Sequence, residues 1–203
     1  MRIVGGRHRG RPLAAPEGMD VRPTADRTRE SLFNILEHGK FSADGISPLH
    51  GSHGRGAFVL DAFAGTGALG FEALSRGAER LVCMDSHADS IACIKANART
   101  LGEVVRLTVF QADATKPPRP PAGPAGTPCG LVFLDPPYGS GLGGPALAAL
   151  AAAGWIAPGA ICILEVGRAE HGTAPEGFTI LDERHYGKAK LVFLRYGAFA
   201  GPP

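Results

Sequence analysis

The sequence of 203 residues has no long hydrophobic run and no paired cysteine motif. No apolar stretch approaches the ~20 residues of a membrane-spanning helix, and the arginine-rich start lacks the apolar segment of a secretory signal. The four cysteines are widely spaced without a CxxC pair, which argues against a zinc site and a disulfide framework. We therefore expect a cytoplasmic protein with reduced thiols, no metal and no membrane contact, acting as a monomer.

The chain also has little excess charge, with a formal net charge of only +2. That charge is unevenly distributed, because residues 1–11 contain several arginines and no acid: Arg2, Arg7, Arg9 and Arg11. A single arginine is usually an ordinary solvated side chain, but a cluster without acids suits phosphate contacts. The glycines among them predict that the first dozen residues form a small hairpin or extended arm with solvated arginines, rather than core.

We divide the chain into a basic arm, residues 1–23, and a single catalytic-size α/β domain, residues 24–203. A helix is predicted from Thr24 or Asp26 to about His38. Strands are expected at 57–61, 80–85 and 105–110, with helices at 68–76 and 88–101 between them. A strand ending at Asp135, a helix at 145–153, a strand at 160–165 and an antiparallel pair at 178–184 and 191–196 follow. This alternation predicts a mostly parallel sheet with helices on both faces.

Two segments are expected to lie outside this pattern. Residues 42–56 are rich in Gly, Ser and His and are predicted to form a loop. Residues 116–128 contain six prolines in thirteen positions, which predicts a stiff surface connection with no core of its own.

The strand at residues 131–134 ends abruptly in Asp135, Pro136, Pro137 and Tyr138. Proline cannot continue a hydrogen-bonded ladder, and ligands of open α/β sheets lie beyond the carboxyl ends of the strands. A carboxylate, a carbonyl left free by the prolines and an aromatic ring suit a flat ligand with an amino group, such as a nucleobase. A plain Pro-Pro turn with a packing tyrosine explains this segment equally well when it is taken alone.

A glycine loop joins the first strand to its helix through Gly65, Gly67 and Gly70. The spacing GxGxxG matches the dinucleotide fingerprint, which favours a nicotinamide cofactor. Asp61 lies just before the loop, where such a cofactor would place phosphates, and a carboxylate there suits a cation better. S-adenosylmethionine offers an ammonium and a sulfonium group with no phosphate, so the glycines need only permit close approach of the backbone.

Acids at the ends of the next strands extend this interpretation. Asp85 is placed to accept from ribose hydroxyls, and Asp113 from the adenine amino group, although each acid is alternatively a cap or turn residue. The predicted cofactor site is completed by neighbours in the same loops and by the start of the first helix: Phe63, Thr66, Ser86, Ala114 and Thr24.

Residues 61–70 followed by Asp135, Pro136, Pro137 and Tyr138 resemble the class I S-adenosylmethionine-dependent methyltransferases that act on exocyclic amines of nucleobases. More closely, residues 5–11, 22–34 and 72–78 resemble the bacterial 16S ribosomal RNA guanine-N2 methyltransferase family, over nearly the whole chain. The resemblance implies a Rossmann-like seven-stranded sheet, S-adenosylmethionine as methyl donor, and a guanine amino group of small-subunit ribosomal RNA, within an assembly particle, as acceptor. The segments 42–56 and 116–128 look longer than this family needs.

Under this interpretation Asp135 and the Pro136 carbonyl accept the hydrogens of the amine, Tyr138 stacks on the base, and the target guanine is flipped out. The predicted RNA contacts are Arg7, Arg9, Arg11, Arg27 and Lys188, with Lys190 as a further candidate. Arg27 is alternatively a pocket residue, with Thr24. The competing hypotheses are an adenine-N6 methyltransferase acting on DNA or RNA, an NAD-dependent oxidoreductase, and a catalytically silent RNA-binding module.

Overall fold

The computed structural model describes residues 1–15, 23–38, 41, 47–50, 56–170 and 174–197. Most of the predicted loop at 42–56 lies outside these ranges. Among the described residues, no helix has the length and apolar character needed to cross a bilayer.

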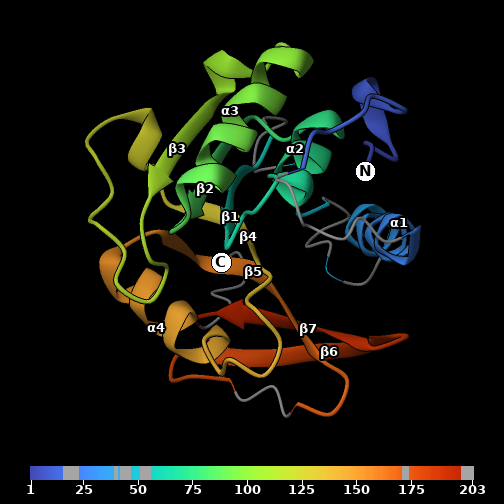
Figure 1. Cartoon of the computed structure of the whole chain (residues 1–203). Coiled ribbons are helices and arrows are strands. Elements are labelled where there is room, and N and C mark those ends of the chain that lie inside the picture. The colour runs from blue at the N-terminus through green and yellow to red at the C-terminus, as the bar shows by residue number, and fades with distance from the viewer. Residues whose placement is uncertain (16–22, 39–40, 42–46, 51–55, 171–173, 198–203) are drawn as a thin grey trace.

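Seven strands form one sheet in the order β3-β2-β1-β4-β5-β7-β6 (Figure 1). They are β1 (Phe58–Ala62), β2 (Arg80–Asp85), β3 (Leu107–Gln111), β4 (Cys129–Leu134), β5 (Ile156–Gly167), β6 (Phe178–Tyr186) and β7 (Ala189–Tyr196). β1 to β5 pair in parallel, whereas β7 is antiparallel to both β5 and β6. The predicted sheet is confirmed. Its strand order reverses between β1 and β4, the place where open α/β sheets bind ligands.

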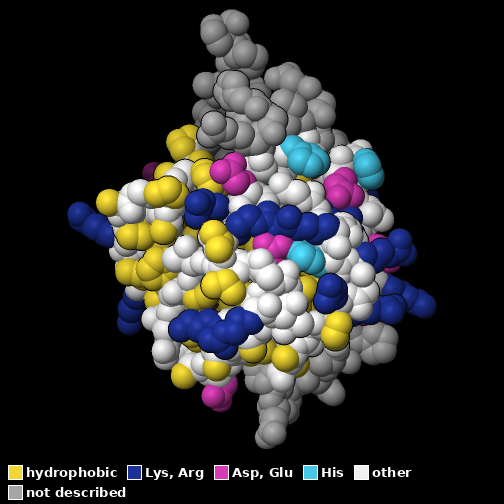
Figure 2. Space-filling model, turned by 90° about the horizontal axis from the view of Figure 1, so that it is seen from above, with side chains coloured by type: hydrophobic (Ala, Val, Ile, Leu, Met, Phe, Trp, Pro, Cys, Tyr) yellow, Lys and Arg dark blue, Asp and Glu magenta, His cyan; other side chains and the backbone are white. Residues whose placement is uncertain are grey.

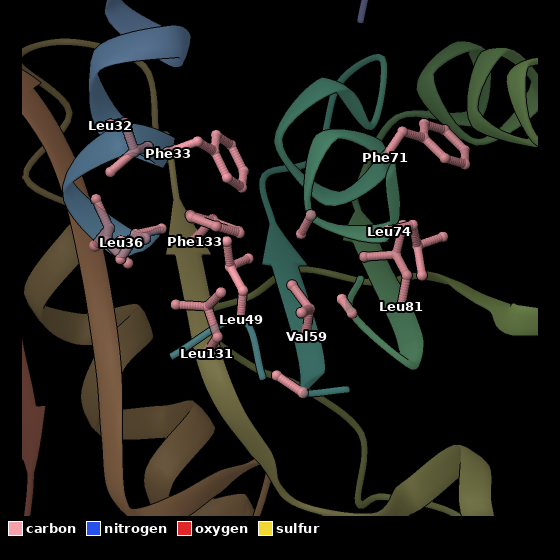
Figure 3. Close-up of a cluster of buried hydrophobic side chains, with 14 of the residues drawn as sticks. Leu32, Phe33, Leu36, Leu49, Val59, Phe71, Leu74, Leu81, Leu131 and Phe133 are labelled. Atoms are coloured by element: carbon pink, nitrogen blue, oxygen red, sulfur yellow. The ribbon is translucent and has the colours of Figure 1, made fainter. Parts of the chain in front are cut away.

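Three helices cover one face of the sheet: α1 (Pro23–His38), α2 (Ala68–Ser75) and α3 (Ala88–Leu101). Figure 3 shows Phe33 of α1 beside Phe133 of β4, and their ring centroids are 5.6 Å apart. Leu74 of α2 lies close to Leu81 of β2 in the same view. Burial of each such side chain contributes roughly 1.5–3 kcal/mol. This packing holds α1 against β4 near its carboxyl end and α2 against β2.

The other face is covered by α4 (Gly143–Ala153) and by the proline-rich connection. Trp155 is fully buried there and stands edge-on to Phe110, with ring centroids 5.3 Å apart. Its indole Nε1 donates a hydrogen bond to the Pro118 carbonyl at 2.7 Å. The connection, which includes the short helix η4 (Pro124–Gly126), is therefore pinned to the core by a tryptophan.

The first residues form the predicted small hairpin, with an isolated antiparallel bridge between Arg2 and Pro12 and the single turn η1 (Gly6–His8). The expectation that this segment stays out of the core is wrong, because Ile3 and Leu13 are buried in the cluster beneath α1. Gly6 has a φ of 70°, and a Cβ there would lie 2.0 Å from the Ser75 carbonyl oxygen. The hairpin thus packs tightly on α2.

A buried carboxylate holds the hairpin, α1 and α2 together. Glu72 of α2 accepts the Val4 backbone N–H at 2.9 Å and the Arg76 Nε–H at 2.8 Å. Arg29 of α1 lies 3.6 Å from the same carboxylate and also hydrogen-bonds the Arg2 carbonyl. Glu72 is fully buried, so each of these partners offsets part of its desolvation.

Candidate active site

Asp61, the fourth residue of β1, lies in the interior with only 2% of its surface exposed. Its Oδ2 accepts a hydrogen bond from the Gly70 backbone N–H at 2.9 Å, which ties α2 to β1. Burial, opposed by this hydrogen bond and reinforced by the charge of Asp85, raises the pKa of Asp61 to about 7. A buried carboxylate with such a pKa is stabilised as an anion by any cation that arrives beside it.

The glycine loop is shaped for close approach of the backbone. Gly65 and Gly67 have φ values of 55° and 76°, and Phe63 adopts a φ of 61°, a costly conformation for a bulky residue. A Cβ on Gly70 would lie 2.4 Å from the Leu81 side chain, so this glycine serves helix-to-strand packing. Thr66 is buried and its hydroxyl donates to the Met1 sulfur at 3.5 Å.

Asp85 ends β2 and braces two loops at once. Its Oδ2 accepts the Gly65 N–H at 2.8 Å, and its Oδ1 accepts the His87 N–H at 2.9 Å. The glycine loop and the β2 loop are thereby joined. Oδ1 also lies 3.2 Å from Nδ1 of His87, so Oδ2 is the oxygen with a lone pair left for a ribose hydroxyl. Ser86, the next predicted residue, is exposed at the surface.

Asp113 follows β3 and is exposed, with its Oδ1 accepting both the backbone N–H and the hydroxyl of Thr115. These two hydrogen bonds lower the pKa of Asp113. Asp113 therefore has the geometry of a turn residue, which was the alternative to a role in ligand binding. Its Oδ2 accepts no hydrogen bond among the described residues and is left for a ligand. Ala114 is buried behind it, in the cluster beneath α4.

Asp135 is the first residue after β4 and lines an open cavity of about 410 Å³. The cavity lies between the carboxyl ends of β4 and β5, the β6–β7 turn, α1 and the chain start, and its other lining residues are Met1, Thr28, Arg29, Leu32, Leu69, Tyr138, Glu165, Tyr186, Gly187, Lys188, Ala189 and Leu191. Within the described part of the chain, no donor reaches the Asp135 carboxylate or the Asp135 and Pro136 carbonyls.

Confinement in this crevice, followed by the negative charges of Glu165 and Asp61, raises the pKa of Asp135 above its usual range. The residue is nevertheless exposed through the cavity mouth, so water moderates the shift that full enclosure would produce. Pro136 is buried and Pro137 exposed, and together they turn the chain away from the sheet.

Tyr138 places its ring at the mouth of the cavity, with 52% of its surface exposed. Its hydroxyl donates a hydrogen bond of 2.5 Å to Oε1 of Glu165. The sequence-based prediction missed Glu165, although an acid ending an apolar strand is the same signal that pointed to Asp135.

The structure describes only one of the two side chains predicted to act from the start of α1. The Thr24 side chain lies outside the described residues. Arg27 does not line the cavity at Asp135, and the α1 residues that do are Thr28, Arg29 and Leu32. Arg27 instead borders a separate hollow between α1 and the hairpin, together with Arg2 and Arg9.

The arm arginines differ in their surroundings. Arg9 and Arg11 are exposed, as expected. Arg7 is not simply solvated, because it forms an ion pair of 2.8 Å with Glu103, a buried carboxylate that follows α3. His8 hydrogen-bonds the same carboxylate. The acids that the arm lacks in sequence are therefore supplied by other segments.

The β6–β7 turn brings one lysine to the cavity. Lys188 is exposed and lines it. Lys190 was a further candidate for RNA contact, but the structure contradicts that role. It is buried, with Nζ 3.3 Å from Oε1 of Glu183 on β6.

Two carboxylates with raised pKa values therefore lie on neighbouring strands, Asp61 buried in β1 and Asp135 after β4 at the cavity. Both lie at the reversal of strand order, beside a strained glycine loop and an aromatic ring. Among the described residues, no group of three or more His, Cys, Asp or Glu side chains could hold a metal ion. The arrangement suits a cation bound at the loop and an amine held at the rim.

A mostly parallel sheet of this order, with acids at or near the ends of β1, β2 and β4, has the architecture of the Rossmann-like methyltransferases. The solved structure of the Escherichia coli protein yhhF is similar over 98% of both chains, with 32% identity and a TM-score of 0.76. The Haemophilus influenzae protein HI0767 covers 97% of this chain and 98% of its own, with 28% identity and a TM-score of 0.71.

Sequence comparison gives the family. The model described as Conserved hypothetical protein 95 matches residues 1–195. The protein named Ribosomal RNA small subunit methyltransferase D of Escherichia coli is 36% identical over 93% of this chain and 86% of its own. The protein of the same name in Haemophilus influenzae is 32% identical over 92% and 89%. The chain therefore belongs to the family described as Conserved hypothetical protein 95, and these relatives of it are named as small-subunit ribosomal RNA methyltransferases.

Proposed function

We propose that the protein transfers a methyl group from S-adenosylmethionine to the exocyclic N2 amine of a guanine in small-subunit ribosomal RNA. The observation that carries this proposal is the Asp135 carboxylate, which has no donor among the described residues and lies at the switch point of the sheet. The names of the relatives support ribosomal RNA of the small subunit as the substrate class.

The residues beside the glycine loop fit S-adenosylmethionine better than a nicotinamide dinucleotide. Asp61 is buried with a raised pKa and has Asp85 as a neighbouring negative charge, so the pocket favours a cation over a pyrophosphate. When bound, S-adenosylmethionine supplies an electrophilic methyl group on a sulfonium. Asp61 would face its ammonium, Asp85 its ribose and Asp113 its adenine, with Phe63, Gly65, Thr66, Gly67, Ser86 and Ala114 as further contacts.

At the rim, the residues act on the acceptor amine. The lone pair of the guanine N2 amine is delocalised into the ring, which makes it a poor nucleophile. Asp135 and the Pro136 carbonyl would accept its two hydrogens and so favour a pyramidal nitrogen. Since the nitrogen becomes acidic only after methylation, Asp135 can take the proton late or pass it to water. Tyr138 would stack on the base, a contact worth about 1–3 kcal/mol.

RNA would approach across the arm and the β6–β7 turn. Arg9, Arg11, Arg27 and Lys188 are exposed, and Arg7 remains half exposed despite its ion pair. Figure 2 shows Lys and Arg side chains in several groups on the face seen from above. A flipped base must leave its helix to reach Asp135, so phosphate contacts around the cavity would hold the strand while it does.

The test uses small subunits and 16S ribosomal RNA from cells that lack this protein. The purified chain with S-adenosylmethionine should yield N2-methylguanosine, identified by mass spectrometry of the digested RNA. Asp135→Asn should abolish turnover while leaving cofactor affinity, measured by calorimetry, unchanged. Glu176→Gln is a matched control, because this exposed acid precedes β6, at the end of that strand away from the β6–β7 turn that lines the cavity. Methylation of adenine only, in RNA or duplex DNA, would refute the proposal.

A further inference from the structure

Glu165 lies on the strand next to Asp135, at the equivalent height of the sheet. Leu134 of β4 is paired with Leu164 of β5 in the parallel register. The residues that follow this pair are Asp135 and Glu165. Adjacent strands are about 4.8 Å apart, so the two acids start from neighbouring positions.

Both acids also reach the same cavity. Phe133 and Ile163, two residues earlier on each strand, belong to the cluster beneath α1. Side chains alternate along a strand, so Asp135 and Glu165 continue the rows on that face. Both line the cavity of about 410 Å³. The charge of Glu165 is one cause of the raised pKa of Asp135, which agrees with this proximity.

Two carboxylates this close repel one another unless donors lie between them. Glu165 accepts only the Tyr138 hydroxyl, through Oε1, and Asp135 accepts nothing, among the described residues. Arg29 and Lys188 line the same cavity, yet neither is in an ion pair with either carboxylate in the described part of the chain. The pair is therefore arranged for a ligand with two adjacent N–H groups.

Guanine presents such an edge, whereas adenine does not. The guanine N1–H lies beside its N2 amine, so both positions donate. Adenine carries an amine too, but its N1 is an acceptor with no hydrogen. A carboxylate facing N1 gains a charge-assisted hydrogen bond with guanine and meets a lone pair with adenine.

We propose that Glu165 determines the base specificity of the enzyme by accepting the N1–H of the target guanine, while Asp135 holds the N2 amine. This inference rests on the proposed methylation of guanine N2, and it names the residue that rejects adenine. Oε2 of Glu165 takes the base while Oε1 keeps Tyr138, so one side chain positions both the base and the ring that stacks on it.

The test replaces the target guanine by 2-aminopurine, which keeps the N2 amine but has an unprotonated N1. The modified nucleotide is introduced into 16S ribosomal RNA by ligation, and the RNA is used free and reconstituted into subunits. Values of kcat/KM for N2 methylation are measured for the native protein, Glu165→Gln, Tyr138→Phe and the Glu176→Gln control. The glutamine amide is isosteric and can donate to an unprotonated N1, and thermal melting checks that each variant folds.

The native protein should strongly prefer guanine. In Glu165→Gln, kcat/KM should fall about 10- to 100-fold on guanine and rise on 2-aminopurine, because the amide can donate to the N1 lone pair that the carboxylate repels. Tyr138→Phe keeps Glu165, so it should lower kcat/KM on guanine and on 2-aminopurine by the same factor and leave their ratio unchanged. Three outcomes would overturn the inference. The native protein could show equal kcat/KM on the two bases, Glu165→Gln could lose equally on both, or Tyr138→Phe could reduce the ratio of kcat/KM on guanine to that on 2-aminopurine as much as Glu165→Gln does. If the native protein forms no N2-methylated base at all, the proposed function fails with it.

Discussion

Replacement of Asp61 by asparagine should make the stability of the ligand-free protein less dependent on pH. The same replacement should weaken cofactor binding. The pKa of Asp61 is raised from 3.8 to about 7 in the folded chain. Between these values the folded state keeps a proton that the unfolded state has lost, so the stability of the native protein falls as pH rises. About 3 units at 1.36 kcal/mol each give a loss of about 4 kcal/mol between pH 4 and pH 8.

The asparagine amide of this variant cannot ionise, so the variant lacks this loss. Its amide oxygen can still accept the Gly70 N–H, and any cost of burying the amide N–H groups is the same at every pH. The measurement is urea unfolding, followed by circular dichroism, of both proteins from pH 4 to pH 8. The free energy of unfolding of Asp61→Asn, minus that of the native protein, should increase by up to about 4 kcal/mol from pH 4 to pH 8. Parallel pH profiles would refute the assignment of a raised pKa to Asp61.

The same variant separates stability from binding. Under the proposed function the Asp61 carboxylate faces the ammonium of the cofactor, and loss of a charge-assisted hydrogen bond costs about 1.5–3 kcal/mol. Affinity for S-adenosylmethionine, measured by calorimetry at pH 8, should therefore fall about 10- to 100-fold. In the native protein, affinity should rise with pH up to about 7 and then level off, because the anion of Asp61 is the binding form. Unchanged affinity in the variant would remove Asp61 from the cofactor site.

Three further changes test other parts of the structure. Glu72→Gln should destabilise the fold by about 1–3 kcal/mol in urea unfolding, because Arg29 and Arg76 lose the buried charge that they share and keep Asp26 and Glu37 as charged partners; an unchanged midpoint would contradict the role of this network. Gly6→Ala places a Cβ against the Ser75 carbonyl and should release the hairpin to protease cleavage, with global stability lowered less than cleavage is accelerated; full protection would show that α2 yields. Lys188→Ala should lower RNA affinity and reduce the salt dependence by about one counterion, leaving cofactor affinity unchanged; an unaltered slope in a salt titration would exclude a phosphate contact.

The regular part of the fold follows from local patterns in the sequence. β2 and α3 begin and end at the predicted residues, because apolar periodicity and Gly102 define them. β3 begins at Leu107 rather than 105, since residues 104–106 form the short turn η3 (Val104–Arg106). β5 begins at Ile156 rather than 160, because Ile156 pairs with Cys129 across a shift in register. Such an irregular pairing has no periodic signal.

In the candidate site, too, local patterns locate some residues, whereas the contacts of others depend on distant segments. Acids and glycines at strand ends could be predicted, since each follows an apolar run within a few residues. The ion pair of Arg7 and the burial of Lys190 could not, because their partners belong to other elements and have no fixed spacing. The hydrogen bond between Glu72 and the Val4 N–H could not be predicted either, because the two residues are 68 positions apart and only the packing of the hairpin brings them together.

Trp155 is the chain's single tryptophan, and its position determines what intrinsic fluorescence can report. The indole lies in the core beneath α4, bonded to the proline-rich connection, on the face of the sheet opposite α1. Its emission will follow loss of that core, where the ring becomes hydrated and the spectrum shifts to the red. Asp135 and Glu165 continue the rows of the opposite face, so binding of a base there will leave the emission unchanged. A titration with RNA therefore needs its own chromophore, whereas unfolding does not.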